Sequence, residues 1–234
     1  IEPGISCGSC RFCIRGMPNL CPSVKFLGTP PIQGAFREFI VMPEKNLIKL
    51  PDELGFAEGT LAEPLAIALY GVRLSMLQPG NTVAIFGTGP IGLSVVFCCK
   101  IGGAGKILAI EPIKQRAEMA KKLGADYVYH PDMEDIKSRI LENTENIGVD
   151  IGYECAGEQE AINRMISVCS IGGKAVIFGI PAQDRICFDP HVVRRKQLPL
   201  ISVRRSAFTT DIALQLMRRS GIKFSSIITH LFPL

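Results

Sequence analysis

A glycine-rich turn between an apolar run and a helix-like stretch limits the possible folds more strongly than any other segment. Residues 83–86 (VAIF) form the run, Gly87-Thr-Gly-Pro-Ile-Gly92 follows with G-x-G-x-x-G spacing, and residues 90–101 have the character of a helix. This order is typical of a strand that leads into a helix beside a bound dinucleotide. Gly87 permits the tight turn, Gly89 lets a pyrophosphate approach the backbone, and Gly92 lets the helix pack closely on the sheet. A glycine turn that binds nothing is the alternative at this point.

Strand-like and helix-like segments alternate after Pro79-Gly80. The apolar runs are continuous, which is typical of strands that are buried on both faces. The pattern therefore predicts an α/β chain with a doubly wound parallel sheet. Further strands are predicted at 106–111, 127–129, 149–154, 175–178 and 200–203, and further helices at 115–123, 134–142 and 159–169, the last closed by Gly172-Gly173.

Glu111 ends the second predicted strand, where a bound dinucleotide would place its adenosine. An acidic side chain there can accept hydrogen bonds from the ribose hydroxyls and repels a 2′-phosphate, which favours NAD over NADP. Lys114 and Arg116 lie close in the sequence and weaken that preference.

The first 61 residues are turn-rich and contain only short strand-like segments. Residues 34–42 (GAFREFIVM) alternate in part and are predicted as a strand, with Pro43 and Pro51 in the loops that follow. We expect this part to be the remainder of a small β domain.

Four of the nine cysteines lie within the first 21 residues, as Cys7, Cys10, Cys13 and Cys21. Thiolates two residues apart on a tight turn can point at one centre, and four of them suit a tetrahedral zinc ion. With no open ligand position, such a site would be structural. The alternatives are an iron–sulfur cluster, whose clustered run normally has a shorter last spacing, and free or disulfide-bonded cysteines. The other five cysteines are expected to be small core residues: Cys98, Cys99, Cys155, Cys169 and Cys187.

Composition excludes several classes of protein. The 234 residues are 47% hydrophobic, which is ample for a sizeable core, and no stretch of 18 apolar residues suggests a membrane span. The net charge of +4 is mild and its basic residues are dispersed, so nucleic-acid binding is not indicated. An odd, unevenly spaced set of cysteines fits a metal site in a reducing cytoplasm better than a disulfide framework.

In its motifs the chain resembles the zinc-type medium-chain dehydrogenases along its whole length. The cysteine cluster, the Gly87–Gly92 turn, Glu111 and the late segment 228–233 (ITHLFP) match that family in order, and Ala62-Glu-Pro-Leu-Ala66 resembles the branch of sorbitol, butanediol and threonine dehydrogenases. The resemblance implies a Rossmann fold joined to part of a GroES-like β domain that carries the zinc lobe. It also implies reversible oxidation of a secondary alcohol, such as a polyol, diol or sugar alcohol, to its ketone with zinc and NAD.

The resemblance also implies roles for individual residues. Glu63 would be a ligand of a catalytic zinc ion, and its alternative is a helix first-turn carboxylate stabilised by the dipole. Arg204 and Arg205 resemble substrate-contacting positions, although the second is a tyrosine in sorbitol dehydrogenase, and a solvated surface charge is the alternative for Arg205. The implied cofactor-binding residues are Gly87, Gly89, Pro90, Ile91, Gly92, Glu111, Arg116, Phe178, Gly179, Ile180, Ser202, Val203 and Arg204.

The expected domains are a partial GroES-like domain at 1–62, an NAD-binding Rossmann domain at 63–204, and the start of the return to the first domain at 205–234. Both ends look cut, and the family's other catalytic-zinc ligands would lie upstream, so we expect this chain alone to be inactive. A cytoplasmic homodimer or homotetramer is implied, with 200–204 as a candidate interface strand. The alternatives to the enzyme are an NAD-binding sensor that also holds zinc but does not turn over, and a zinc-independent relative of the quinone reductases.

Overall fold

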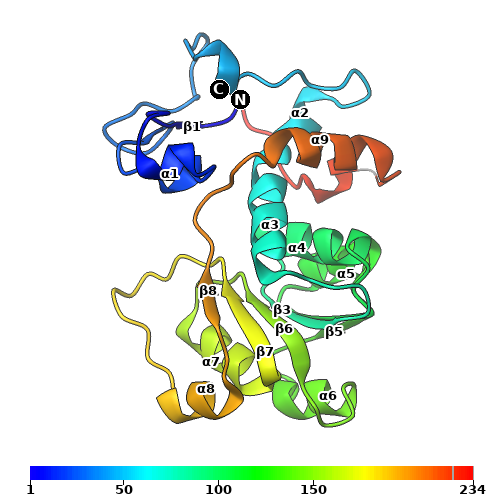
Figure 1. Cartoon of the computed structure of the whole chain (residues 1–234). Coiled ribbons are helices and arrows are strands. Elements are labelled where there is room, and N and C mark those ends of the chain that lie inside the picture. The colour runs from blue at the N-terminus through cyan, green and yellow to red at the C-terminus, as the bar shows by residue number, and fades with distance from the viewer. Residues whose placement is uncertain (223, 234) are drawn as a thin grey trace. The chain divides into compact units, whose positions relative to one another are not determined.

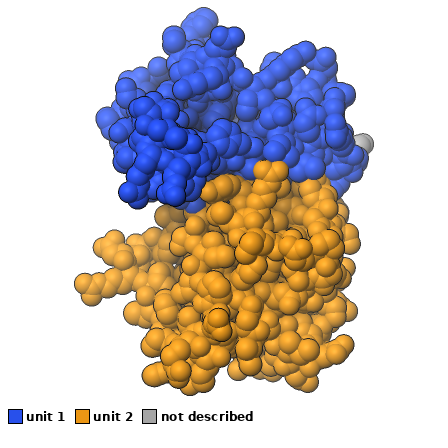
Figure 2. All heavy atoms as spheres, in the orientation of Figure 1, with its two compact units in different colours: residues 1–67, 204–234 blue, residues 68–203 orange. Residues whose placement is uncertain are grey.

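The computed structural model describes residues 1–222 and 224–233, which form two compact units (Figure 1). Unit 1 comprises residues 1–67 and 204–234, and unit 2 comprises residues 68–203 (Figure 2). The first division falls inside helix α3 (Ala62–Ser75) and the second follows strand β8 (Leu200–Ser202). From the sequence, these two borders were expected after residues 62 and 204.

Unit 2 is built on a six-stranded parallel sheet in the order β5-β4-β3-β6-β7-β8. The chain winds outward from β3 in one direction and from β6 in the other, so a switch in direction lies between these two central strands. This is the doubly wound order, and it confirms the predicted fold class. The strands are β3 (Thr82–Phe86), β4 (Lys106–Ile110), β5 (Tyr127–Tyr129), β6 (Val149–Glu154), β7 (Cys169–Ile177) and β8.

Helices cover both faces of this sheet. One face contributes Phe86, Leu108 and Tyr129 to a buried cluster with α6 (Ile136–Glu142) and α7 (Gln159–Val168). Helices α4 (Pro90–Ile101) and α5 (Lys114–Leu123) contact each other and pack on β3 and β4. Right-handed crossovers that run in opposite directions from the centre place the two helix pairs on opposite faces. The central strands are therefore sealed from water on both sides, which is why their sequences are continuously apolar.

Local signals in the sequence fix where several elements begin and end. Gly124 caps the end of helix α5. It adopts φ +116° and donates its N–H to the carbonyl of Lys121, while Ala125 N donates to the carbonyl of Ala120. Glycine is the residue that reaches this left-handed conformation without steric cost. Asp135 caps the start of helix α6, and its carboxylate accepts from the N–H groups of Lys137 and Ser138. The Ser138 hydroxyl also donates to this carboxylate, and this bond, with the smaller effect of the backbone N–H groups, lowers the pKa of Asp135.

One boundary predicted from the sequence is wrong. Helix α7 ends at Val168, strand β7 begins at once at Cys169, and Gly172-Gly173 lie inside the strand instead of closing the helix. Cys169 pairs with Val149, and Lys174 pairs with Ile151, so the intervening residues of β7 bulge out of the ladder. Such glycines mark a bulge as readily as a helix end, and only the pairing decides between them.

Several helices were not identified in the sequence, among them α1 (Arg11–Ile14), α2 (Phe56–Gly59), α3, α8 and α9. Helix α8 (Pro190–Lys196) precedes β8 and is capped by Asp189, whose side chain accepts from the N–H of His191. Helix α9 (Thr210–Arg219) lies in unit 1 and buries Ala213, Leu214 and Met217.

The expectation that the five scattered cysteines are core residues is partly wrong, because Cys98, Cys99 and Cys169 are buried but Cys187 is exposed.

Unit 1 consists of short elements joined by turns. Its only described strand pair is β1 (Gly4–Ile5) with β2 (Lys25–Phe26), which are antiparallel. The buried Asn46 ties distant segments together, because its amide donates to the carbonyls of Glu2 and Gly4. Its other elements are α1 (Arg11–Ile14), η1 (Pro18–Leu20), η2 (Glu44–Asn46), α2 (Phe56–Gly59), the start of α3, α9 and η3 (Phe224–Ile227).

The strand predicted at 34–42 does not form, and this prediction is wrong. These residues take bends and irregular conformations, and the side chains of Phe36, Phe39 and Val41 are 99%, 86% and 97% exposed. Partial alternation marks a sequence that can pair, but a strand also needs a neighbour to complete its hydrogen bonds. No described strand pairs with this segment.

Among the described residues, no helix is long and apolar enough to cross a membrane.

Candidate functional site

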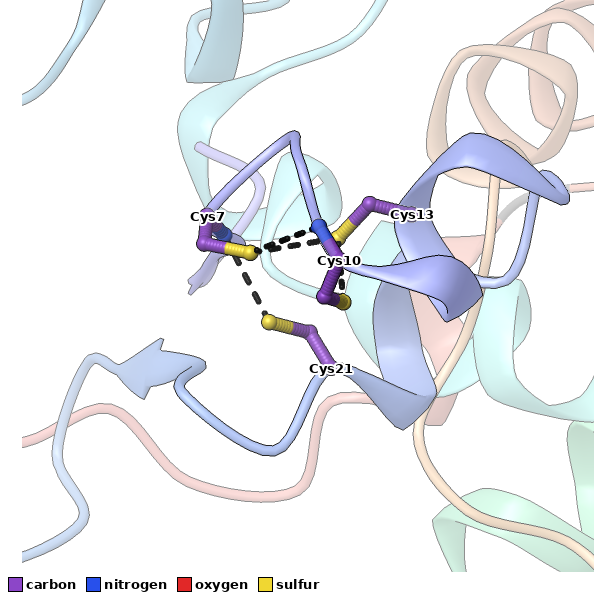
Figure 3. Close-up of side chains that lie close together, drawn as sticks. All are labelled: Cys7, Cys10, Cys13 and Cys21. Atoms are coloured by element: carbon purple, nitrogen blue, oxygen red, sulfur yellow. Dashed lines mark hydrogen bonds between the residues drawn. The ribbon is translucent and has the colours of Figure 1, made fainter.

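The four predicted metal-ligand cysteines lie together in unit 1, at the turn around α1 and η1 (Figure 3). Their Sγ atoms all lie within 4.8 Å of one another. The Sγ of Cys13 is 3.5 Å from that of Cys10 and 3.9 Å from that of Cys7. Backbone N–H groups also point inward, since Cys10 N donates to Cys7 Sγ at 3.3 Å and Cys7 N donates to Cys21 Sγ at 3.5 Å. Among the described residues this is the one cluster of three or more candidate metal ligands.

The thiols of this cluster differ in acidity. Backbone N–H groups of Ser9 and Cys10 lower the pKa of Cys7 to about 6, because they stabilise its thiolate. Desolvation and the neighbouring Cys10 thiol raise the pKa of Cys13 to about 11. One thiol is thus prepared as an anion, while another needs a nearby positive charge to ionise. A divalent cation at the centre would supply that charge.

The glycine turn follows β3 directly and opens α4, as its sequence predicts. Gly87 has φ +87°, and a Cβ on Gly92 would lie 1.9 Å from the carbonyl oxygen of Gly87, so helix and turn are in backbone contact. At Gly89 the situation is the opposite. The nearest atom to a Cβ there would be Nη1 of Arg116 at 4.0 Å, so open space lies in front of this residue. Backbone packing therefore fixes the turn on one side and leaves it free on the other.

Glu111 lies one residue beyond the end of β4, beside this turn, and is 3% exposed. Its Oε2 accepts from both the backbone N–H of Thr88 at 2.7 Å and the Thr88 hydroxyl at 3.1 Å. Its Oε1 accepts from the N–H of Ile113 at 2.9 Å. Arg116 on α5 is exposed and brings its guanidinium near Gly89. The structure thus brings three predicted cofactor residues together at the ends of β3 and β4.

A second turn, residues 154–157, packs against the glycine turn from the neighbouring strand β6. Glu154 is completely buried, and its Oε1 accepts from the N–H groups of Ala156 at 2.8 Å and Gly157 at 2.6 Å. A Cβ on Gly87 would lie 3.0 Å from Ala156, so the two turns touch. Burial raises the pKa of Glu154, whereas the backbone N–H groups that donate to its carboxylate lower it and so oppose that shift. Sequence reasoning missed this residue, although an acid at the end of the strand before a glycine was visible in E-C-A-G.

The end of β7 completes this edge of the sheet. Phe178 N and Gly179 N both donate to the carbonyl oxygen of Glu154, at 2.8 and 3.3 Å. The Phe178 ring points into unit 2, because a Cβ on Gly71 of α3 would lie 2.1 Å from its Cζ and 2.9 Å from Cγ2 of Val203. Ile180, by contrast, is 93% exposed, and Ser202 is exposed at the end of β8. Of the predicted nicotinamide-side residues, Phe178 and Val203 therefore face α3, whereas Ile180 faces solvent.

The predicted catalytic residues Glu63, Arg204 and Arg205 all lie in unit 1. Glu63 is exposed in the first turn of α3, and desolvation together with the negative charge of Glu2 raises its pKa. The guanidinium of Arg205 stacks over the ring of Phe26, with Cζ 4.1 Å from the ring centroid, and lines a cavity of about 490 Å³. Among the described residues, no hydrogen bond or ion pair joins Glu63 to either arginine. The structure does not assemble these three side chains into one group.

Comparison with known proteins gives two family matches. A model of the "Zinc-binding dehydrogenase" family matches residues 90–219, and a model of the "Alcohol dehydrogenase GroES-like domain" matches residues 1–52. The chain is also 33% identical to sorbitol dehydrogenase of Bacillus subtilis over 234 residues, an alignment that covers 100% of this chain and 66% of that protein.

Solved structures show the same similarity. An Escherichia coli oxidoreductase/dehydrogenase of unknown specificity superposes with a TM-score of 0.93 and 33% identity, over 98% of this chain and 66% of the other. A Sinorhizobium meliloti zinc-binding dehydrogenase, described as putative and bound to NADP, superposes with a TM-score of 0.87 and 30% identity, over 94% and 65%. The chain thus spans about two thirds of the length of each of these proteins.

Proposed function

The chain belongs to the zinc-binding dehydrogenase family, and on this premise we propose that the whole protein is a zinc-dependent dehydrogenase that interconverts a secondary alcohol and its ketone with NAD. The observation that carries this proposal is the glycine turn at the direction switch of the sheet, with open space in front of Gly89. Ligands of doubly wound sheets bind at this point, outside the carboxyl ends of the strands.

The four cysteines fit a structural zinc ion. Tetrahedral coordination with Zn–S bonds of about 2.3 Å places sulfur atoms about 3.8 Å apart. The Sγ–Sγ separations of 3.5 and 3.9 Å, from Cys13 to Cys10 and to Cys7, lie on either side of this value. The ion would hold together a lobe that has little other regular structure. It would take no part in the reaction, because four thiolates leave no open position.

The edge of unit 2 fits a dinucleotide. The first N–H groups of α4 lack partners inside the helix, and the helix dipole favours negative charge at this end. Pro90, at the first position, has no N–H, so Ile91 and Gly92 are the residues that offer donors to a pyrophosphate. Gly89 leaves the backbone accessible there, and Arg116 adds a positive charge. When bound, NAD would supply the hydride acceptor.

A catalytic zinc site is not assembled by the described residues. Glu63 is the one ligand that we propose for it, whereas three or more candidate ligands gather only at the cysteine cluster in the described part of the chain, so no step is derived through that ion. What this chain itself contributes to the chemistry is the placement of the cofactor by the strand ends of unit 2. Arg204, exposed just after β8, is proposed to orient a second hydroxyl of the substrate.

The substrate class that we propose is a polyol or vicinal diol. Support comes from the 33% identity to a sorbitol dehydrogenase, spread over the entire chain. We further propose a cytoplasmic homodimer or homotetramer. In the described part of the chain β8 is one of the two edge strands of the sheet, with β5 at the other edge, and we propose that β8 contacts the second subunit.

The test is NAD reduction by the whole protein with a panel of polyols, vicinal diols and threonine, before and after zinc chelation. We expect turnover of at least one polyol or diol, which stops when zinc is removed. NAD binding without turnover of any substrate would replace the enzyme by a cofactor-binding sensor. Turnover that survives complete zinc removal would instead support a relative that does not use zinc.

A further inference from the structure

The Glu154 carboxylate closes the turn at residues 154–157, the Glu154 turn, from inside unit 2. Its side chain is completely buried, and its Oε1 accepts from the N–H groups of Ala156 at 2.8 Å and Gly157 at 2.6 Å. Its Oε2 is also buried and has no hydrogen-bond partner among the described residues. A buried N–H that lacks an acceptor is costly, so a single oxygen atom holds the chain in this turn after β6.

The Glu154 turn lies between two other strand ends. On the side of β3, a Cβ on Gly87 would lie 3.0 Å from the backbone N of Ala156. On the side of β7, a Cβ on Gly179 would lie 2.3 Å from the backbone N of Gly157 and 2.5 Å from Oε2 of Glu154. Backbones this close cannot move independently, because a packed interior has no space to take up the shift. The Glu154 turn therefore sets the spacing between the glycine turn and the end of β7.

The two neighbours of the Glu154 turn differ in their other supports. The glycine turn is also held from β4, where Gly87 N donates to the carbonyl of Ile110 at 2.8 Å. At the end of β7, Phe178 N and Gly179 N both donate to the carbonyl oxygen of Glu154. If the Glu154 turn is displaced, the end of β7 should therefore move more than the glycine turn.

We propose that Glu154 is a positioning residue that, through the hydrogen bonds its Oε1 accepts, aligns the end of β7 with the glycine turn. The first of these segments is the predicted nicotinamide side of the cofactor site, and the second is its proposed pyrophosphate side. The inference rests on the proposed function, because it requires that this edge of the sheet binds a nicotinamide dinucleotide. When the acceptor is lost, the pyrophosphate side should stay in place and the nicotinamide side should be misplaced.

Three variants and a control test this role. Glu154→Met keeps the length of the side chain and removes both oxygens, whereas Glu154→Gln keeps an oxygen that can accept in place of Oε1 and serves as the conservative rescue. Gly157→Ala leaves the carboxylate intact but adds a Cβ 3.0 Å from the carbonyl oxygen of Ile180, at a residue with φ +75°. It pushes the Glu154 turn away from the end of β7 by another route, and it decides the question if Glu154→Met does not fold. Glu142→Met removes an exposed carboxylate from α6 and is the matched control.

The measurement is the dissociation constant of NADH and of ADP-ribose for the whole protein and each variant, by calorimetry well below the unfolding temperature. ADP-ribose carries the pyrophosphate but no nicotinamide, so the ratio of the two constants reports on the nicotinamide side alone. We expect the unmodified protein to bind NADH at least about tenfold more tightly than ADP-ribose. Glu154→Met and Gly157→Ala should raise the constant of NADH by about tenfold and that of ADP-ribose by less than about threefold. Glu154→Gln and Glu142→Met should leave both constants within about threefold of those of the unmodified protein.

A loss of stability alone would not change the ratio of the two constants, because both ligands bind the same folded protein. If Glu154→Met weakens NADH and ADP-ribose equally, or weakens neither, the carboxylate does not align the two sides. If Glu154→Gln weakens NADH as much as Glu154→Met does, the charge and not the accepted hydrogen bonds is responsible, and the inference is wrong.

Two results with the unmodified protein would also overturn the inference. If it binds NADH and ADP-ribose equally, nothing holds the nicotinamide side, and the inference fails while dinucleotide binding stands. If it binds neither ligand, the proposed function itself fails, and this inference fails with it.

Discussion

Gly92 and Gly87 are in such close contact that a Cβ on Gly92 would lie 1.9 Å from the carbonyl oxygen of Gly87. Alanine at residue 92 therefore has to move the backbone of the turn. We expect Gly92→Ala to destabilise unit 2 by about 3 kcal/mol, at the upper end of the usual range for overpacking. Urea denaturation followed by circular dichroism measures this change.

Gly89→Ala is the matched control for that prediction. A Cβ at this residue meets no atom closer than 4.0 Å, and the φ of −66° is open to alanine. The free energy of unfolding should change by less than about 1 kcal/mol, the range of neutral surface substitutions and propensity effects. NADH binding should nevertheless be lost, because the methyl group occupies the place proposed for the pyrophosphate. Equal stability losses in the two variants would contradict this division of roles.

Removal of one thiolate should release the structural zinc. Cys10→Ser replaces a ligand of the four-sulfur cluster, and we expect the zinc content, measured by plasma mass spectrometry, to fall from about one ion per chain to near zero. Cys187→Ser, at an exposed thiol of unit 2, should retain the full zinc content. Zinc that stays bound to the Cys10→Ser variant would show that the ion sits elsewhere.

Gly71 leaves room for the Phe178 ring, and this fit can be tested with two substitutions. A Cβ at residue 71 would lie 2.1 Å from Cζ of that ring. Gly71→Ala should therefore cost about 2 kcal/mol of unfolding free energy through overpacking. Phe178→Leu shortens the side chain, so the double variant should recover part of that loss. Additive effects of the two changes, within about 0.5 kcal/mol, would show that the residues are not coupled.

The buried Glu154 should make the stability of unit 2 depend on pH. Burial raises the pKa of Glu154 above its ordinary value of 4.5, so the folded chain keeps the proton in a range where the unfolded chain has lost it. Well below pH 4.5 the carboxyl is protonated in both the folded and the unfolded chain. Between this ordinary value and the folded pKa only the folded chain keeps the proton, so the unfolding free energy falls as the pH rises. Above the folded pKa it falls no further. Glu154→Gln cannot titrate. The unfolding free energy of the unmodified chain relative to this variant should decline as the pH rises above the ordinary value of 4.5 and level off above the folded pKa, whereas a constant difference would contradict the shift.

The bounds of a strand or helix were predicted accurately where the local apolar pattern favours the same element that the tertiary structure forms. The strands at 127–129 and 149–154 and the helix at 90–101 have the bounds that were expected. The helix is followed directly by Gly102, and the apolar residues of the two strands pair with neighbouring strands of the sheet. Residues 34–42 show the limit of this reasoning, because a strand's hydrogen bonds come from a neighbour that its own sequence does not specify.

The prediction of site residues was likewise successful where the residues lie close together in the sequence. The spacing of Cys7, Cys10, Cys13 and Cys21 indicated a common centre, because short loops confine thiols that are near in sequence. Glu154 and Gly71 were not found, since each acts on a residue that lies far along the chain: Gly71 on Phe178, and the Glu154 turn on Gly87. The guanidinium of Arg205 lies on Phe26, a contact across most of the chain length that the sequence did not indicate, and its role at the substrate stays a prediction.

Sequence alone determined the alternation of strands and helices, the glycine turn between strand and helix, and the cysteine cluster, because each depends on residues within one short segment. Only the tertiary structure decided where Glu111 directs its carboxylate. The sequence places an acid at the end of β4, but the neighbouring turn of β3 supplies the donors, and burial then favours protein partners over solvent. A side chain's role at a sheet edge depends on which adjacent strand reaches it, and that is a property of strand order, not of local sequence.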